Sequence, residues 1–201
     1  MVIREVGVVV VTQQGETEPE ARLAAMGWPG RPLTDEPLAA DLINTRWLAG
    51  TDEYDLLEED ALTLAWLDKH GLDTGAAAAD VRRHLREARS ALAAAVADPS
   101  DTAALNRILD HGRVRLSLEA EGAIETPEVG DAARHAAWMC ARDLLRVTTE
   151  APGRMRKCAN PPCPLHFVDT SRKGERRWCS MALCGNRAKA QRHRTRHHVA
   201  T

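Results

Sequence analysis

The chain has 201 residues, of which 44% are apolar, and a formal net charge of −2 at pH 7. This length suits one domain with a small added module, or two small domains. The apolar run at residues 6–11 is too short to span a bilayer and lacks the features of a signal peptide. We therefore expect a cytoplasmic protein that has no membrane association and keeps its cysteines reduced.

Charge is distributed unevenly along the chain. Residues 152–201 hold twelve Lys and Arg but only Asp169 and Glu175 as acidic residues, a net of +10. Residues 1–151 therefore hold fifteen basic and 27 acidic residues, a net of −12. Such asymmetry is typical of a nucleic-acid-binding segment attached to an acidic body. The alternative is that the two oppositely charged parts simply attract each other.

The first 32 residues give the least regular pattern. Residues 6–12 are β-branched and strand-like, and a stretch rich in Pro and Gly follows from Pro19 to Pro32. The sequence leaves open whether residues 1–32 form a strand of the fold or a loosely held extension. We treat them as a separate N-terminal segment.

Helical periodicity dominates from residue 37 onward. A short helix is expected over residues 38–45, and a second where apolar residues repeat at helical spacing before Gly71. The repeating residues are Leu57, Ala61, Leu64 and Leu67. Residues 76–97 predict a long helix that ends at Asp98-Pro99. Ser100 or Asp101 is the expected cap of the short helix that follows.

The period changes to two at residues 113–119, which predicts a half-buried strand with residues 123–126 as its hairpin return. Residues 131–148 then predict another amphipathic helix. Its Cys140 is expected in the core rather than as a nucleophile or metal ligand. Pro152-Gly153 marks a boundary, so we assign residues 33–151 to a mainly helical domain and residues 152–201 to a basic module.

The basic module contains two cysteine pairs of equal C-x4-C spacing, Cys158 with Cys163 and Cys179 with Cys184. Four soft thiolates that converge on one point make a closed tetrahedral site, so we predict one structural Zn²⁺. His166 is the alternative ligand. The second pair is expected to span a helix start capped by Ser180, where side chains on either side of the cap meet.

The segment between the pairs predicts a small zinc fold. The first pair brackets a turn at Asn160-Pro161-Pro162, and residues 165–169 and 176–178 can form a hairpin. A loop, a hairpin and a helix that supplies the last ligands resemble a treble-clef or zinc-ribbon arrangement. The predicted fold class is therefore α+β: a mainly helical domain with a small hairpin, plus a four-cysteine zinc finger with a basic helix.

Basic side chains follow the cysteines closely, and arginines that fork onto phosphates make nucleic acid the expected partner. A solvated, frayed helix is the alternative. Trp178 is expected to cover the metal site rather than stack on a base. The candidate nucleic-acid-binding residues are Arg172, Lys173, Arg176, Arg177, Arg187, Lys189, Arg192, Arg194 and Arg196.

Residues 157–187 resemble the CGNR zinc-finger family, with both cysteine pairs, residues 167–169, residues 176–181 and Cys184-Gly185-Asn186-Arg187 in place. Residues 40–45 and 64–67 are similar to the ABATE domain, whose members are described as stress-induced transcription regulators. The resemblance implies zinc at the four cysteines and a role in transcription. Related chains are sometimes labelled RNA-binding.

These observations favour a zinc-dependent DNA-binding transcription regulator. Its N-terminal domain would sense a signal, such as a small-molecule effector, or mediate self-association as a homodimer. An RNA-binding protein and a protein-interaction adaptor are the alternatives. Asn44 and Thr45 could line a pocket, although capping or turn roles are favoured. We expect no enzyme, because the sequence has no Gly-rich phosphate loop, nucleophile elbow or open metal triad.

Overall fold

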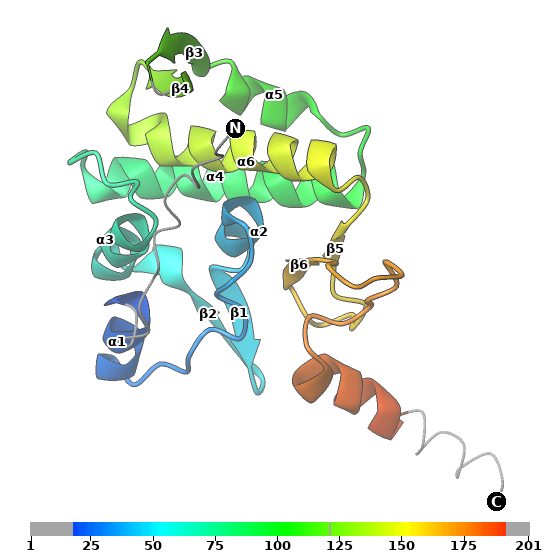
Figure 1. Cartoon of the computed structure of the whole chain (residues 1–201). Helices are drawn as coiled ribbons and strands as arrows, with labels where there is room; N and C mark the ends of the chain where they lie inside the picture. The colour runs from blue at the N-terminus through cyan, green and yellow to red at the C-terminus, as the bar shows by residue number, and fades with distance from the viewer. Residues whose placement is uncertain (1–17, 121, 192–201) are drawn as a thin grey trace, which may run out of the picture.

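Two long helices form the centre of the molecule, which we describe from a computed structural model covering residues 18–120 and 122–191. The strand-like residues 6–12 lie outside this range. Helices α4 (Ala78–Ala97) and α6 (His135–Glu150) lie side by side, as Figure 1 shows. The described residues form an α+β fold, as predicted. Its strands form three separate two-stranded antiparallel ribbons.

Several small residues are buried on the neighbouring helices α4 and α6. Ala88 on α4 and Ala137 and Ala141 on α6 are buried, and Cys140 is fully buried among them. Small side chains on a 3.6-residue period allow two helix axes to approach closely. Cys140 is therefore a core residue, as expected, and burial raises the pKa of its thiol. Helix α5 (Ala103–Leu109) packs against both long helices and begins after Thr102 rather than after the predicted Ser100 or Asp101.

A helix occupies part of the segment that the sequence left as a strand or an extension. Helix α1 (Glu18–Ala25) packs against α3 (Asp60–Lys69), and its Leu23 is fully buried. Gly27 follows with a φ of 71°, the left-handed conformation that commonly ends a helix. The Gly and Pro residues that suggested an extension thus mark the end of a packed helix.

Half of the predicted apolar repeat before Gly71 is buried, namely Leu57 and Leu67. Ala61 and Leu64 are exposed, whereas Leu62 and Trp66 are buried. Leu57 precedes the helix, in the 3₁₀ turn η1 (Leu56–Glu58). The indole of Trp66 donates a hydrogen bond of 2.7 Å to the buried Asp41 carboxylate, which turns this face toward the core.

Strands β1 (Arg46–Ala49) and β2 (Asp52–Asp55) form a hairpin that the sequence did not indicate. Gly50 has a φ of 66°, which suits the first position of a two-residue hairpin turn. Trp47 on β1 stacks on Tyr54 of β2, with ring centroids 5.6 Å apart, and Trp28 packs against both rings. The hairpin is thus held by an aromatic cluster.

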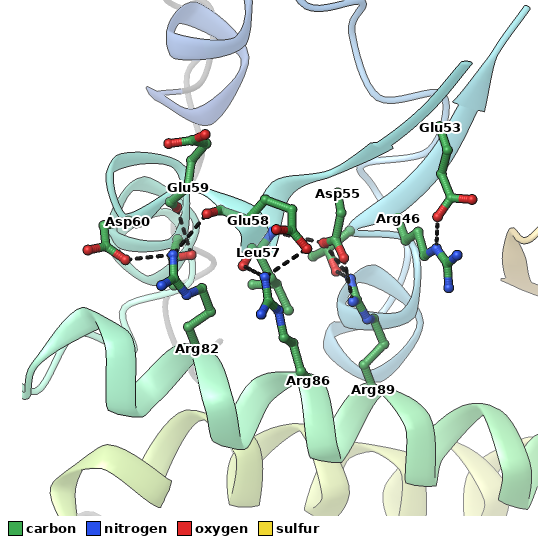
Figure 2. Close-up of polar contacts among 12 residues, drawn as sticks. Arg46, Glu53, Asp55, Leu57, Glu58, Glu59, Asp60, Arg82, Arg86 and Arg89 are labelled. Atoms are coloured by element: carbon green, nitrogen blue, oxygen red, sulfur yellow. Dashed lines mark hydrogen bonds and ion pairs between the residues drawn. The ribbon is translucent and has the colours of Figure 1, made fainter. Parts of the chain in front are cut away.

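Three arginines of α4 hold the segment that leads from this hairpin into α3 (Figure 2). Arg89 contacts both carboxylate oxygens of Asp55, at 2.7 and 2.6 Å. Arg86 donates to the Leu57 carbonyl at 2.6 Å, and Arg82 donates to the Glu58 carbonyl at 2.9 Å. Their spacing along α4 puts all three on one face of the helix. That face therefore fixes the start of α3 as well as the end of β2.

The predicted half-buried strand is mostly exposed. Strands β3 (Gly112–Glu119) and β4 (Gly122–Val129) pair as predicted, but Leu116 and Leu118 are 72% and 85% exposed. Only the base of the ribbon is tightly packed. A Cβ at Gly112 would lie 2.6 Å from the Trp138 indole nitrogen, so glycine permits that contact. Alternation of side chains thus does not by itself imply a buried face.

Asp41 on helix α2 (Leu38–Ile43) joins several elements through one buried carboxylate. It accepts hydrogen bonds from Arg31, from Trp66 and from His70, the last at 2.8 Å. Burial by itself would raise the pKa of Asp41, but these hydrogen bonds and the Arg31 and His70 charges lower it overall. The carboxylate therefore stays ionised and ties the loop before α2 to the end of α3.

The basic module packs directly on the helical domain through α2. The Asn44 side chain makes two hydrogen bonds with the backbone of His166, at 2.9 and 2.8 Å. Glu36 accepts a third from the Val168 N–H at 2.8 Å. Both partners lie on strand β6 (His166–Val168), which pairs with β5 (Met155–Lys157). Met155 and Phe167 of these strands are buried in the same core as α2 and α4.

We expect Asn44→Ala to lower the free energy of unfolding by about 2–4 kcal/mol, because it leaves two buried backbone groups of His166 unpaired. Urea denaturation followed by tryptophan fluorescence measures this difference. The matched control is Asn106→Ala on the exposed face of α5, which should change stability by roughly 0.5 kcal/mol or less. Equal effects of the two substitutions would contradict a structural role for the Asn44 contacts.

Candidate metal centre

The first cysteine pair lies in the loop of the β5–β6 hairpin. The predicted hairpin between residues 165–169 and 176–178 was wrong, because β6 pairs with β5 instead, with Lys157 opposite His166. The Cys158 N–H donates to the Leu165 carbonyl at 2.9 Å, and the Cys163 N–H donates to the Asn160 carbonyl at 2.8 Å. These bonds close a tight loop that turns both sulfurs to the same side.

The second pair spans a helix start, as predicted. Ser180 is extended, and its hydroxyl accepts a hydrogen bond from the Ala182 N–H at 3.2 Å. The first turn, η3 (Met181–Gly185), is π-helical, and the Gly185 N–H donates to the Ser180 carbonyl at 3.0 Å. Residues 186–191 continue as helix. Cys179 and Cys184 thus lie on either side of the cap.

The four sulfurs converge on one buried point. All four lie within 4.8 Å of one another, and those of Cys163 and Cys179 are 3.8 Å apart. Zn–S bonds of about 2.3 Å in a regular tetrahedron need sulfurs about 3.8 Å apart. The donor set therefore fits a metal ion that prefers four thiolates. His166 is outside this set, and its Nδ1 lies 3.0 Å from the Pro164 carbonyl oxygen.

The electrostatics of the cluster call for a cation. A hydrogen bond from Cys179 lowers the pKa of Cys163 to about 6, and the same contact strongly raises the pKa of Cys179. Burial raises the pKa of Cys184 to about 11. Four thiolates this close repel one another unless a metal ion neutralises them. Two N–H donors also face the sulfurs, Asn160 to Cys184 and the Cys179 backbone to Cys158, each at 3.4 Å.

Gly185 lies in close contact with the Met181 side chain in the η3 turn. A Cβ at this position would lie 2.6 Å from the Met181 sulfur and 3.4 Å from a ring carbon of Trp178. Trp178 itself is half-buried against the core. A Cβ at Gly185 would therefore displace the flexible end of the exposed Met181 side chain, whereas its distance to Trp178 is an ordinary contact.

Arg176, a predicted nucleic-acid contact, is directed inward. Its guanidinium donates to the carbonyls of Trp178 and Cys179, and it lies over the Phe167 ring at 4.2 Å. It also lies 3.8 Å from Glu36 of the helical domain. Arg176 thus braces the chain beside Cys179. The sequence showed the positive charge of Arg176, but nothing in it indicated that the side chain is directed inward.

Asp169, Glu36 and Asn44 were missed as positioning residues. The buried Asp169 carboxylate accepts hydrogen bonds from the Ser171 hydroxyl and from the backbone of Ser171 and Arg176. The Ser171 hydroxyl contributes most to lowering the pKa of Asp169. An Asp followed two residues later by Ser was the available signal for this turn. Nothing local points to Glu36 and Asn44, because their partners lie more than 120 residues away.

The other described residues among the predicted nucleic-acid contacts are exposed to solvent. They form no ion pair with a described carboxylate. We call this set the exposed cations: Arg172, Lys173, Arg177, Arg187 and Lys189. The Arg177 guanidinium lies over the Trp178 ring at 5.4 Å. The predicted contacts Arg192, Arg194 and Arg196 lie outside the described residues.

Comparison with known families matches both parts of the chain. A model described as "CGNR zinc finger" matches residues 154–197. The ABATE model, described as "Putative stress-induced transcription regulator", matches residues 36–151. No curated protein matches the chain. Within residues 18–120 and 122–191, we find no helix with the length and hydropathy that crossing a bilayer requires.

We expect about one zinc ion per chain in the wild type and close to none in Cys184→Ser after dialysis against a weak chelator. Removal of one thiolate opens the tetrahedron, and the remaining ligands bind less tightly. Atomic emission of the dialysed protein measures the metal content. Cys140→Ser is the matched control and should retain its zinc, because Cys140 lies in the α4–α6 core. Zinc retained in Cys184→Ser would show that Cys184 is not a ligand.

Proposed function

Because the chain belongs to the ABATE family of stress-induced transcription regulators and carries a CGNR zinc finger, we propose that it is a zinc-dependent DNA-binding transcription regulator. One structural Zn²⁺ is bound by Cys158, Cys163, Cys179 and Cys184. The zinc finger binds DNA, and the helical domain senses a signal or mediates self-association. The protein acts in the cytoplasm, where its thiols stay reduced.

The observation that carries this proposal is the position of the exposed cations relative to the metal centre. Cys184 lies in the turn that begins the final helix, and Arg187 and Lys189 follow on the same helix. Figure 1 shows this helix leading away from the helical domain. A metal-fixed helix that presents unpaired cations to solvent is suited to phosphate contacts along a duplex. The inward Arg176 is not part of this surface.

Two features favour DNA over single-stranded RNA. Sequence-specific RNA recognition commonly stacks unpaired bases on exposed aromatic rings. Phe167 is fully buried beneath Arg176, and Trp178 is half-buried with Arg177 over its ring. These are the zinc finger's two aromatic residues. Contacts from arginine and lysine side chains to the phosphates of a duplex therefore account for binding better than base stacking does.

Neither an adaptor nor an enzyme fits the zinc finger as well. Within the chain the zinc finger meets the helical domain through Glu36 and Arg176, and the exposed cations take no part in that contact. Four protein ligands leave a zinc ion no open position for water or substrate, so we propose no catalytic role. The apolar side chains on the β3–β4 ribbon, Leu116 and Leu118, support self-association as a homodimer.

Duplex binding should depend steeply on salt. If the five exposed cations each contact a phosphate, the slope of log K against log [salt] should be about −4.5. Fluorescence anisotropy with genomic DNA fragments between roughly 50 and 200 mM salt measures this slope. The double variant Arg187→Ala/Lys189→Ala should bind more weakly and reduce the slope by about two.

The matched control is Arg107→Ala, an exposed arginine on α5, which should leave both affinity and slope unchanged. Cys184→Ser should abolish binding, because the helix loses its fixed start. Stronger competition by structured RNA than by duplex DNA would refute the DNA assignment. A slope near zero would refute nucleic-acid binding by these cations.

A further inference from the structure

The described part of the final helix has an outer side and an inner side. Residues 186–191 are α-helical, and Asn186, directly after the η3 turn, has helical dihedral angles of φ −69° and ψ −38°. Among residues 186–190 only Ala188 is partly buried, and the other four are exposed. Ala188 therefore marks the inner side, and the opposite side of the helix is open to solvent.

An uncharged amide lies in the middle of the outer side, with one cation on each flank. An α-helix advances about 100° per residue, so Asn186 and Ala190 lie about 40° apart and directly opposite Ala188. Arg187 and Lys189 lie about 80° to either side of the line between them. We call these four residues, Asn186, Arg187, Lys189 and Ala190, the outer face of the final helix.

This order of side chains matches the cross-section of a DNA groove. The major groove of B-DNA is wide enough to admit an α-helix. A helix in that groove directs its middle line at the base edges and its flanks at the two phosphate backbones. Arg187 and Lys189 are thus placed for phosphates of opposite strands. Asn186 is placed for a base edge, and the small Ala190 allows the helix to approach closely enough for a short side chain to reach it.

The Asn186 amide is also free to bind. Its side chain is exposed and makes no hydrogen bond within residues 18–120 and 122–191. The other asparagine of the zinc finger is used by the fold, since Asn160 donates to the Cys184 sulfur at 3.4 Å. An asparagine amide offers one donor group and one acceptor, and adenine presents the matching pair, N7 and N6–H, in the major groove.

We propose that Asn186 recognises an adenine in the major groove. Its Nδ2–H donates to adenine N7 and its Oδ1 accepts from N6–H, while Arg187 and Lys189 bind phosphates on either side. This inference rests on the proposed function and deepens it, because it names the base-specific contact of the same zinc finger. Cys184 lies two residues before Asn186, so the metal centre fixes the position from which the amide reaches the base.

The test starts with the zinc-loaded full chain and a selection of duplexes from a random pool. We expect the selected duplexes to share an invariant adenine. Anisotropy then compares the selected duplex with a scrambled duplex of the same composition. Asn186→Ala should bind the selected duplex about tenfold more weakly than the wild type does, and the scrambled duplex equally well. Its zinc content and salt slope should not change, because Asn186 contacts neither metal nor phosphate.

Two control variants show whether the loss is specific to the base. Asn106→Ala, on the exposed face of α5, should bind both duplexes like the wild type. Arg187→Ala/Lys189→Ala should weaken binding to both duplexes by the same factor, because phosphate contacts carry no sequence information. Equal losses of Asn186→Ala on the two duplexes would overturn base recognition by this residue.

A modified base isolates the hydrogen bond. Replacing the invariant adenine with 7-deazaadenine removes the N7 acceptor and keeps base pairing. The wild type should bind the modified duplex about fivefold more weakly, whereas Asn186→Ala should not distinguish the two duplexes. A loss that persists in the variant would overturn the assignment. If Asn186→Ala does not retain its zinc, Asn186→Asp replaces it, since it has the same shape but no donor for N7.

The same measurements separate this proposal from the proposed function. A wild type that binds duplexes with a steep salt slope but selects no invariant adenine would overturn base recognition by Asn186 and leave the DNA-binding regulator intact. A wild type that binds no duplex at any salt concentration would overturn the proposed function, and base recognition with it.

Discussion

The convergence of four sulfurs on one buried point is the constraint on which the zinc finger depends. Strands β5 and β6 have three residues each, and they supply only Met155 and Phe167 as fully apolar core side chains. So small a module cannot stabilise itself by burial. Zinc binding contributes about 10–16 kcal/mol to the folding of isolated zinc-finger peptides. The hairpin loop, the Ser180 cap and the start of the final helix all take their positions from this one centre.

The helical domain supplies the rest of the zinc finger's support. Phe167 lies in the common core, and Asn44 and Glu36 pair with backbone groups on β6 that would otherwise be unsatisfied. The zinc finger is thus attached by side chains that bind its backbone, not by a linker alone. Arg176 extends the same contact, since it joins Glu36, Phe167 and the chain beside Cys179. A substitution in α2 is therefore separated from the metal centre by only a few side-chain contacts.

The sequence predicted those parts of the structure that are determined by residues close to one another along the chain. The cysteine pairs, the Ser180 cap and the long α4 helix each depend on residues within a few positions of one another. The predicted strand partner of β6 was wrong. A strand of three residues is too short for its pattern of side chains to distinguish between two neighbouring segments. The β1–β2 hairpin and the Asn44 contacts depend on distant residues, which periodicity does not register. Counting charge likewise did not distinguish the inward Arg176 from the exposed Arg177.

The π-helical turn at Met181–Gly185 sets the angular position of everything that follows it. An α-helix advances about 100° per residue, so a turn that holds one extra residue rotates the rest of the helix by about that angle. A helical wheel drawn from Ser180 with a constant period therefore assigns Arg187 and Lys189 to the wrong sides of the cylinder. Deleting one residue between the cap and Gly185 would turn the cationic face by more than a quarter of a revolution, and it would also shorten the Cys179–Cys184 spacing on which the metal centre depends. The orientation of this surface is thus encoded in the length of a single turn.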